Sequence, residues 1–137
     1  MKRAIVIDTN LIFSALLSNS SQIRDSLLDE SCVFYAPNYI IAEIFKHQRK
    51  MFKLTKLDEN DFFTYFNSII ENIQFIPLDF ISTENRQKAY DLCHDIDPKD
   101  IPFVALSLEL QLPLWTGDNK LKKGLTLKGF DRFYSIS

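Results

Sequence analysis

Two aspartates in this sequence follow short apolar segments at the point where each segment ends. Asp8 comes directly after residues 4–7, and Asp118 follows residues 112–116 through Gly117. If both segments are parallel strands of one sheet, their carboxyl ends meet at one edge, where such sheets collect ligands. Asp is also a favoured helix N-cap and turn residue, so either one alone has a purely structural explanation. The pair at one edge indicates a site.

Three further carboxylates stand where they could join this edge. Asp100 lies at the cap or in the first turn of a predicted helix, because Pro102 is tolerated only near a helix start. The helix dipole stabilises a carboxylate there with or without a ligand, so capping and ligation both remain open. Asp97, before Pro98, is a nearby acid that could itself be a local cap. Glu43 lies roughly 130° from the apolar face of its predicted helix and matters only if that helix borders the cleft.

Carboxylates grouped in this way need a cation. They repel one another and raise one another's pKa unless a positive charge lies between them. These oxygen ligands have no accompanying His or Cys, a set that favours Mg²⁺ or Mn²⁺ over zinc. Such ions typically activate water and neutralise phosphate oxygens, so the group predicts metal-assisted chemistry on a phosphate.

Basic residues follow two of these acids without interruption. No acid occurs between Glu43 and Asp58, and none occurs between Asp118 and Asp131. Lysines that hold a polyanion beside an acidic metal site would give this pattern, as would two solvated helix faces. The basic residues predicted to contact such a substrate are Lys46, Arg49, Lys50, Lys120, Lys122 and Lys123.

Several other chemistries find no support. His47 and His94 have no triad signature, and a chain with 3 glycines has no phosphate-binding glycine loop. Cys32 and Cys93 lack the spacing of a metal site or a disulfide framework, so a reducing, cytoplasmic location is expected. The apolar run that ends before Asp8 is far shorter than the ~20 residues of a membrane span, so no membrane association is expected. A net charge of −2 argues against a protein that coats nucleic acid.

Strands and helices alternate along the chain. With 137 residues, 46% of them hydrophobic and 25% charged, residues 1–137 fit one globular domain. The expected strands are residues 4–7, 32–36, 73–76, 112–116 and 133–136. The expected helices are residues 11–16, 22–29, 37–51, 58–71, 82–95, 99–110 and 120–123, the last stopped by Gly124. This order predicts an α/β fold, a three-layer α/β/α domain with a central, mainly parallel sheet of about five strands.

The ordered motifs resemble the PIN domain family. The residues that carry the resemblance are Ala4-Ile5-Val6-Ile7-Asp8-Thr9-Asn10, Glu43 after the second strand, Asp100 five residues before Ala105-Leu106, and Trp115-Thr116-Gly117-Asp118. Each motif alone is weak, and the strength lies in the ordered set, which covers nearly the whole chain. PIN domains are metal-dependent nucleases, and many small members are toxins of VapC-type toxin–antitoxin pairs. The resemblance therefore implies a ribonuclease that uses Mg²⁺ or Mn²⁺, with an antitoxin protein as a partner.

The resemblance also implies roles for individual acids. Asp8, Glu43, Asp100 and Asp118 match the family's catalytic quartet. In that role Asp8 would be the central metal ligand, and Asp100 and Asp118 would complete the metal site. Asp97 would support or replace Asp100 as a ligand, and Glu43 would orient the attacking water.

Polar residues beside the acids match supporting positions of the family. Thr9, Asn10, Thr116 and Asn119 would hold the acids through hydrogen bonds. The basic residues named above would hold the RNA backbone. The implied reaction is hydrolysis of an RNA phosphodiester to a 5′-phosphate and a 3′-hydroxyl.

Two other hypotheses remain open. The chain could be a catalytically inactive PIN-like binding or assembly module whose acids hold no metal. A phosphoryl-transfer domain with Asp8 as the acceptor would also place an aspartate at a strand end, but Asn10 stands where that chemistry needs a second acid. The Phe-rich segment 52–66 could pack on a second copy of the chain or on an antitoxin, and core packing would explain it equally well.

Overall fold

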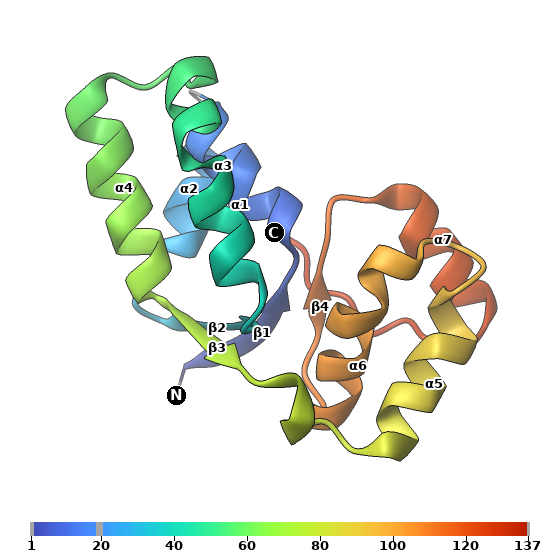
Figure 1. Cartoon of the computed structure of the whole chain (residues 1–137). Coiled ribbons are helices and arrows are strands. Elements are labelled where there is room, and N and C mark those ends of the chain that lie inside the picture. The colour runs from blue at the N-terminus through green and yellow to red at the C-terminus, as the bar shows by residue number, and fades with distance from the viewer. Residues whose placement is uncertain (1, 19–20, 137) are drawn as a thin grey trace.

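Four short strands form a parallel sheet at the centre of the fold. The computed structural model describes residues 2–18 and 21–136. The strands are β1 (Arg3–Ile7), β2 (Cys32–Pro37), β3 (Ile73–Ile76) and β4 (Leu114–Trp115), in the order β3-β2-β1-β4 (Figure 1). Ile5, Val6 and Ile7 in β1 are all fully buried, as expected for a strand covered on both faces.

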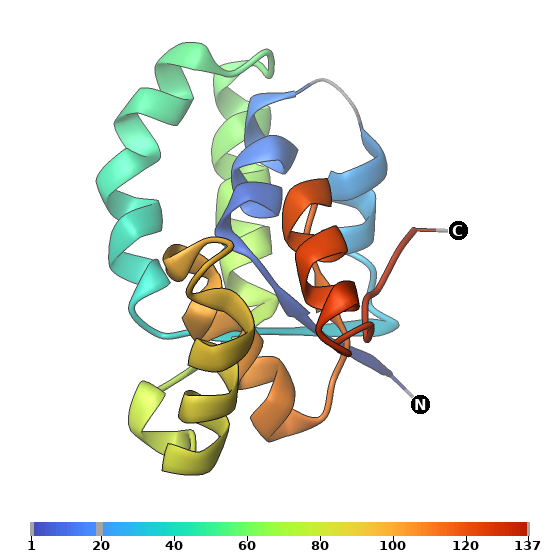
Figure 2. The same ribbon diagram turned by 90° about the vertical axis from the view of Figure 1, so that its right-hand side faces the viewer.

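Helices cover both faces of this sheet. On one side lie α1 (Thr9–Leu17), α2 (Ser21–Leu27), α3 (Ile40–Leu54) and α4 (Glu59–Glu71), with α1 touching the other three (Figure 1). Figure 2 shows α1 and α3 side by side. On the other side lie α5 (Thr83–Cys93), α6 (Ile101–Leu110) and α7 (Asn119–Leu127), with α5 packed on both neighbours. Short 3₁₀ turns at η1 (Leu78–Phe80) and η2 (Pro98–Asp100) precede α5 and α6. The predicted three-layer α/β/α architecture is confirmed.

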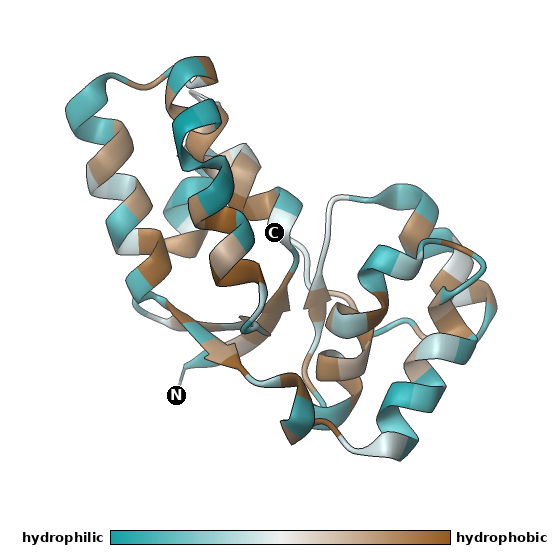
Figure 3. Ribbon diagram, viewed as in Figure 1, coloured by the Kyte–Doolittle hydropathy of each residue, from teal (hydrophilic) through white to brown (hydrophobic). Residues whose placement is uncertain are grey.

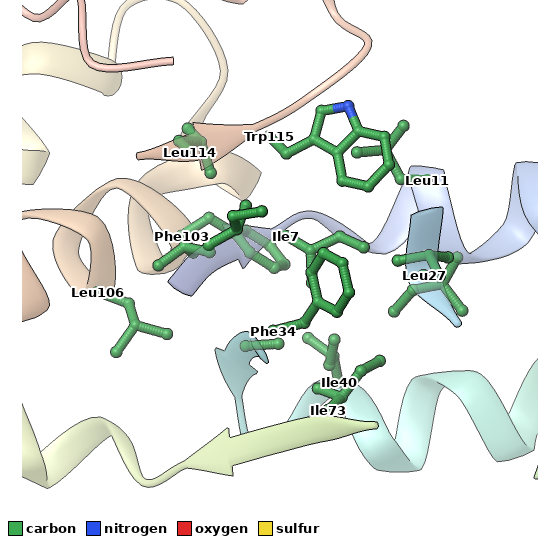
Figure 4. Close-up of a cluster of buried hydrophobic side chains, with 14 of the residues drawn as sticks. Ile7, Leu11, Leu27, Phe34, Ile40, Ile73, Phe103, Leu106, Leu114 and Trp115 are labelled. Carbon is green, nitrogen blue, oxygen red and sulfur yellow. The ribbon is translucent and has the colours of Figure 1, made fainter. Parts of the chain in front are cut away.

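Large apolar side chains fill the space between the sheet and its helices. Figure 4 shows Ile7 and Phe34 from the central strands between Phe103 of α6 and Leu27 of α2. The Phe34 ring lies 6.1 Å from the ring of Trp115 in the edge strand β4. Burial of this kind, at roughly 25 cal/mol per Å² of apolar area, is what holds the strand ends in fixed positions.

Hydrophobic residues are concentrated in the strands and on the inner faces of the helices (Figure 3). The outer turns of α5 and α4 are hydrophilic in the same view. Within the described residues, no helix combines the length and the apolar character that a membrane span requires.

The sheet has four strands rather than the expected five or so. Residues 133–136 form only an isolated parallel bridge, in which Phe133 faces Leu114. The reason lies in β4, which is just two residues long because Pro113 has no N–H before it and the chain turns into α7 after it. A strand of that length offers little backbone for a further partner. The expected strand at residues 112–116 is shortened for the same reason.

Pro37 ends a strand instead of opening a helix. It is the last residue of β2 and pairs in register with Ile76 of β3. The following turn is held by the Asn38 N–H, which donates to the Ile76 carbonyl at 2.8 Å, and α3 then begins at Ile40. The prediction that the helix starts at residue 37 is therefore wrong by three positions.

Gly124 does not stop the last helix. The helix α7 runs through it to Leu127, and the left-handed turn falls at Gly129, with φ of 95°. A Cβ at position 124 would lie 2.5 Å from Cδ1 and 2.9 Å from Cγ1 of Ile96. The glycine therefore lets α7 pack closely against the segment just before Asp97. This packing brings Asp118, the N-cap of α7, toward Asp97.

We expect Gly124→Ala to destabilise the protein by about 1–2 kcal/mol. Alanine favours a helix by about 1 kcal/mol over glycine, but its Cβ would displace Ile96 in a packed interface. Thermal and urea unfolding would measure the effect, with Thr126→Ala on the exposed side of the same helix as the control. Ile96→Ala should absorb part of the cost in the double variant. A gain in stability from Gly124→Ala alone would contradict this packing.

Candidate functional site

Five acids converge on one cavity at the carboxyl ends of β1 and β4. The cavity has a volume of about 470 Å³. Its acidic lining consists of Asp8, Glu43, Asp97, Asp100 and Asp118. The strands β1 and β4 run parallel to the same edge, where α1 and α7 begin (Figure 1). The structure thus brings together all five acids that the sequence singled out.

Asp8 and Asp118 both cap helices that start at this edge. The Asp8 carboxylate accepts a hydrogen bond from the Leu11 N–H at 3.2 Å. The Asp118 carboxylate accepts one from the Leu121 N–H at 3.1 Å. The structural explanation for each residue is therefore correct, but it uses only one carboxylate oxygen, and both residues also line the cavity. The positive ends of α1 and α7 stabilise the two negative charges there.

Thr116 connects these two acids. Its hydroxyl donates to the Asp8 carboxylate and accepts from the Asp118 N–H at 3.1 Å. The side chain is almost completely buried, so the hydroxyl has no water to replace these partners. Because the main-chain N–H of Asp8 also donates to the Trp115 carbonyl at 3.3 Å, the relative position of the two acids is fixed by strand pairing.

The other residues expected to support the acids differ in their placement. The backbone N–H of Asn10 donates to the Asp8 carboxylate, and both Thr9 and Asn10 line the cavity. Asn119 is exposed at the start of α7 and is not among the lining residues. A hydrogen-bonding role for Thr9 and Asn119 stays a prediction.

Asp97 and Asp100 lie at the two ends of the short turn before α6. Asp97 caps η2 by accepting from the Lys99 N–H at 3.1 Å. Asp100 stands at the N-cap position of α6 and makes no side-chain capping bond. Capping, which the sequence left open, does not account for Asp100. Oxygens of Asp97, Asp100 and Asp118 lie within 4.8 Å of one another, a spacing that suits shared ligands of one cation.

The cluster raises the pKa of two of its members. Burial raises the pKa of Asp8, with Asp118 adding to the effect. Burial raises the pKa of Asp100 to about 7, and the carboxylates of Asp97, Asp8 and Asp118 add to this shift. Among the described residues, no ion pair of a Lys, Arg or His includes any of these four acids. A hard divalent ion fits this uncompensated oxygen set.

Glu43 is exposed, as its helical periodicity predicted, and its helix does border the cavity. Its side chain is 48% exposed, and one carboxylate oxygen lies 3.6 Å from Nε2 of His47. The His47 ring in turn meets the ring of Phe13 edge-on at 5.7 Å. Glu43 is therefore the acid nearest to solvent, held by a neighbour one helical turn away.

The basic residues predicted to bind a polyanion do not line the cavity. Lys46, Arg49 and Lys50 are exposed on α3, and Lys120, Lys122 and Lys123 lie on α7, with Lys122 half-buried. Their contact with a substrate stays a prediction.

Four cavity residues escaped the sequence analysis. They are Phe13, Tyr39, Lys99 and Phe103. Tyr39 lies four residues before Glu43, Phe13 lies five residues after Asp8, and Lys99 and Phe103 lie one residue before and three residues after Asp100. These spacings place each residue close to an acid in the sequence. The residues were not predicted because their side chains are not typical metal ligands.

Comparisons with known proteins agree with this geometry. A family model of the PIN domain matches residues 6–134. The chain belongs to the PIN domain family. Its fold is similar to a chain in the crystal structure of VapBC2 from Rickettsia felis bound to a DNA fragment from their promoter, with a TM-score of 0.60 and 14% identity over 88% of this chain and 92% of that one. No curated protein matches this member of the PIN family.

We expect the metal-free protein to lose stability as the pH rises from about 4 to about 7, and to lose little more from this group above that range. The folded chain holds a proton on Asp100 up to about pH 7, whereas the unfolded chain releases it near the ordinary value of 3.8. The folded state therefore binds more protons between these values, so the free energy of unfolding falls across this range and levels off once Asp100 is ionised in both states. Asp100→Asn cannot ionise and should be more stable than the native chain at about pH 8, by roughly 2 kcal/mol after solvent screening.

Thermal unfolding in a chelator at several pH values measures this difference. Asp79→Asn, which removes an exposed acid outside the cavity, is the control. The advantage of Asp100→Asn should shrink toward about pH 5 and disappear below the unfolded-state pKa. An advantage that does not change with pH would show that repulsion among these acids is not its cause.

Proposed function

We propose that this protein is a divalent-metal-dependent endoribonuclease. The observation that carries the proposal is the convergence of Asp97, Asp100 and Asp118 within 4.8 Å of one another, beside Asp8, at the strand ends of a PIN domain. Among the described residues, no Lys, Arg or His forms an ion pair with any of these four aspartates, so their repulsion favours a bound cation.

The ion would be Mg²⁺ or Mn²⁺. Asp8, Asp100 and Asp118 would hold it, with Asp97 as a further ligand. A bound ion of this kind supplies positive charge that activates water and neutralises phosphate oxygens. Thr116 and the backbone of Asn10 keep the Asp8 carboxylate in place, so the ligand set is organised before a cation arrives.

Glu43 would orient the attacking water and accept its proton. It is the most solvent-exposed acid of the cavity, and one of its carboxylate oxygens is paired with His47. Hydroxide oxygen then bonds to phosphorus while the bond from phosphorus to the 3′ oxygen breaks. The proton ends on that oxygen, which leaves a 5′-phosphate and a 3′-hydroxyl.

The RNA would be held by charge outside the acidic cavity. Lys46, Arg49 and Lys50 on α3 would hold phosphates on one side. Lys120, Lys122 and Lys123 on α7 would hold phosphates on the other, and Lys99 stands at the cavity itself. Contacts to the backbone of this kind position a nucleic acid without reading its sequence.

A protein partner fits the same proposal. The structural neighbour is a VapBC complex, so we propose that this chain is the toxin of a toxin–antitoxin pair. The paired helices α3 and α4 expose Phe45 and Phe63, at 52% and 38%, which an antitoxin or a second copy of the chain would cover. The buried free thiols of Cys32 and Cys93 suit a reducing, cytoplasmic setting.

We expect saturable Mn²⁺ binding by the native protein and its loss in Asp8→Asn and in Asp118→Asn. Asparagine is a good N-cap, so both variants keep the hydrogen bonds that start α1 and α7 while losing a charge. Calorimetry measures binding, and cleavage of single-stranded RNA in Mn²⁺ should fall by more than about a hundredfold. Asp79→Asn is the matched control outside the cavity.

Three results would contradict the proposal. Native protein that binds no Mn²⁺ would favour a PIN-like binding or assembly module that has no catalytic function. Binding that survives both substitutions would place the ion elsewhere. Cleavage that persists in a chelator would separate the nuclease activity from the acid cluster.

We expect the combined variant Lys46→Ala, Arg49→Ala and Lys50→Ala to bind RNA more weakly and with a smaller dependence on salt. Each phosphate contact removed from a single strand lowers the slope of log affinity against log salt by about 0.7, so three contacts lower it by roughly 2. Fluorescence anisotropy across a salt series measures the slope. Lys88→Ala on α5, whose lysine pairs with Glu84 at 3.4 Å, is the control. An unchanged slope would mean that α3 does not hold phosphates.

A further inference from the structure

Tyr39 is an aromatic residue at the acidic cavity with no evident structural task. It lies just before α3, lines the cavity and is 40% exposed. Although it occupies the N-cap position of α3, its side chain makes no capping bond. A large side chain that stays this exposed at a cavity gains little from burial, so its position calls for a ligand.

Three other tyrosines of the chain have ring or cation partners, and Tyr35 in β2 packs against the core. Tyr65 packs under the Arg24 guanidinium at 4.6 Å, Tyr90 stacks on His94 at 4.4 Å, and Tyr134 meets the Trp115 ring at 5.2 Å. Among the described residues, the Tyr39 ring takes part in no such ring or cation pair. The side chain lines the cavity and is partly exposed, so it can contact a molecule bound there.

The turn that carries Tyr39 is rigidly attached to the sheet. The Asn38 N–H donates to the Ile76 carbonyl at 2.8 Å, and the Ile41 N–H donates to the Asn38 carbonyl at 3.2 Å. Ile40, the next residue, is buried in the core. The backbone at Tyr39 is therefore held at a fixed place relative to the acids, so a ligand need not order this turn.

The phenol adds no charge to the acid cluster. Burial raises the pKa of the Tyr39 phenol, and the carboxylates of Asp100 and Glu43 raise it further. The hydroxyl therefore stays neutral near two carboxylates, and the ring offers an uncharged surface beside them. Phe13 and the nearly buried Phe103 are uncharged residues that line the same cavity.

We propose that Tyr39 is a substrate-binding residue whose ring stacks on an unpaired nucleobase of the RNA next to the phosphate at the acid cluster. The assignment rests on the proposed nuclease function, which brings a phosphodiester to these acids. A nucleobase has an aromatic face whatever its identity, so stacking holds any unpaired base and requires that it be out of a duplex. Tyr39 would thereby fix which side of the phosphate enters the cavity.

The test compares two probes of equal charge. One is a short fluorescein-labelled single-stranded RNA of mixed sequence, and the other is an abasic oligomer with the same number of phosphates. Anisotropy is measured with Ca²⁺, a hard cation for oxygen ligands, in place of Mg²⁺. The native protein should prefer the base-bearing probe by roughly tenfold, in keeping with one stacked base.

Variants at position 39 should change this preference and nothing else. Tyr39→Ala should bind the two probes equally, whereas Tyr39→Phe should keep the preference because it keeps the ring. Tyr90→Ala, which removes a tyrosine that is 50% exposed on α5, should behave like the native protein. Unchanged Mn²⁺ binding and thermal unfolding in Tyr39→Ala would exclude damage to the acid cluster or to the fold.

The assignment and the proposed function can fail separately. A native protein that binds both probes equally, or binds neither, overturns the role of Tyr39, as does a preference that survives Tyr39→Ala. Cleavage of the same RNA in Mn²⁺ tests the nuclease function in a separate reaction. A base preference lost in Tyr39→Ala without any cleavage supports Tyr39 and overturns the nuclease, and cleavage without a base preference does the reverse.

Discussion

Repulsion between carboxylates that the backbone holds close together is the constraint on which this site depends. Asp8 is fixed because its N–H donates to the Trp115 carbonyl, and Asp118 is fixed because its N–H donates to Thr116. Neither can withdraw without breaking the pairing of β1 with β4 or the start of a helix. Burial then raises the pKa of Asp8 and Asp100, which shows that the ionised form of these carboxylates costs free energy in the folded protein. The large apolar core supplies the stability that makes this arrangement tolerable.

Helix capping and ligand binding share the same residues in this fold. Asp8, Asp97 and Asp118 each accept a hydrogen bond, through one carboxylate oxygen, from a backbone N–H at the start of α1, η2 or α7. The helix ends bring partial positive charge to the cavity, which lowers the cost of grouping the acids. Asp100 makes no capping bond, and the acids around it raise its pKa to about 7. Local structure therefore explains the position of Asp100 less well than that of the other aspartates. A bound cation would explain it best.

The sequence predicted those features that depend on local order along the chain. Asp8 could be found because it directly follows a buried strand, and Asp118 because it lies a few residues beyond another. Helical periodicity correctly predicted that Glu43 is exposed. Periodicity does not predict how one helix or strand packs against another. It could not tell that α3 borders the cavity or that Gly124 lies in a tight contact with Ile96 rather than at a helix end. The predicted fifth strand at residues 133–136 depends on tertiary packing in the same way. Its length is limited by the backbone that the two-residue strand β4 offers for pairing.

Charge is divided between the cavity and its surroundings in a way that bears on recognition. The lining holds five acids and Lys99, whereas the remaining basic residues proposed to bind RNA lie outside it on α3 and α7. Attraction by those residues weakens as salt screens it, and it acts on every phosphate alike. The neutral rings of Tyr39, Phe13 and Phe103 lie beside the acids and neither repel a phosphate nor respond to salt in this way. An RNA strand attracted by these basic residues would therefore be positioned by contact with the uncharged rings. In this arrangement, the basic residues capture the RNA, and the rings determine which phosphodiester bond reaches the acids.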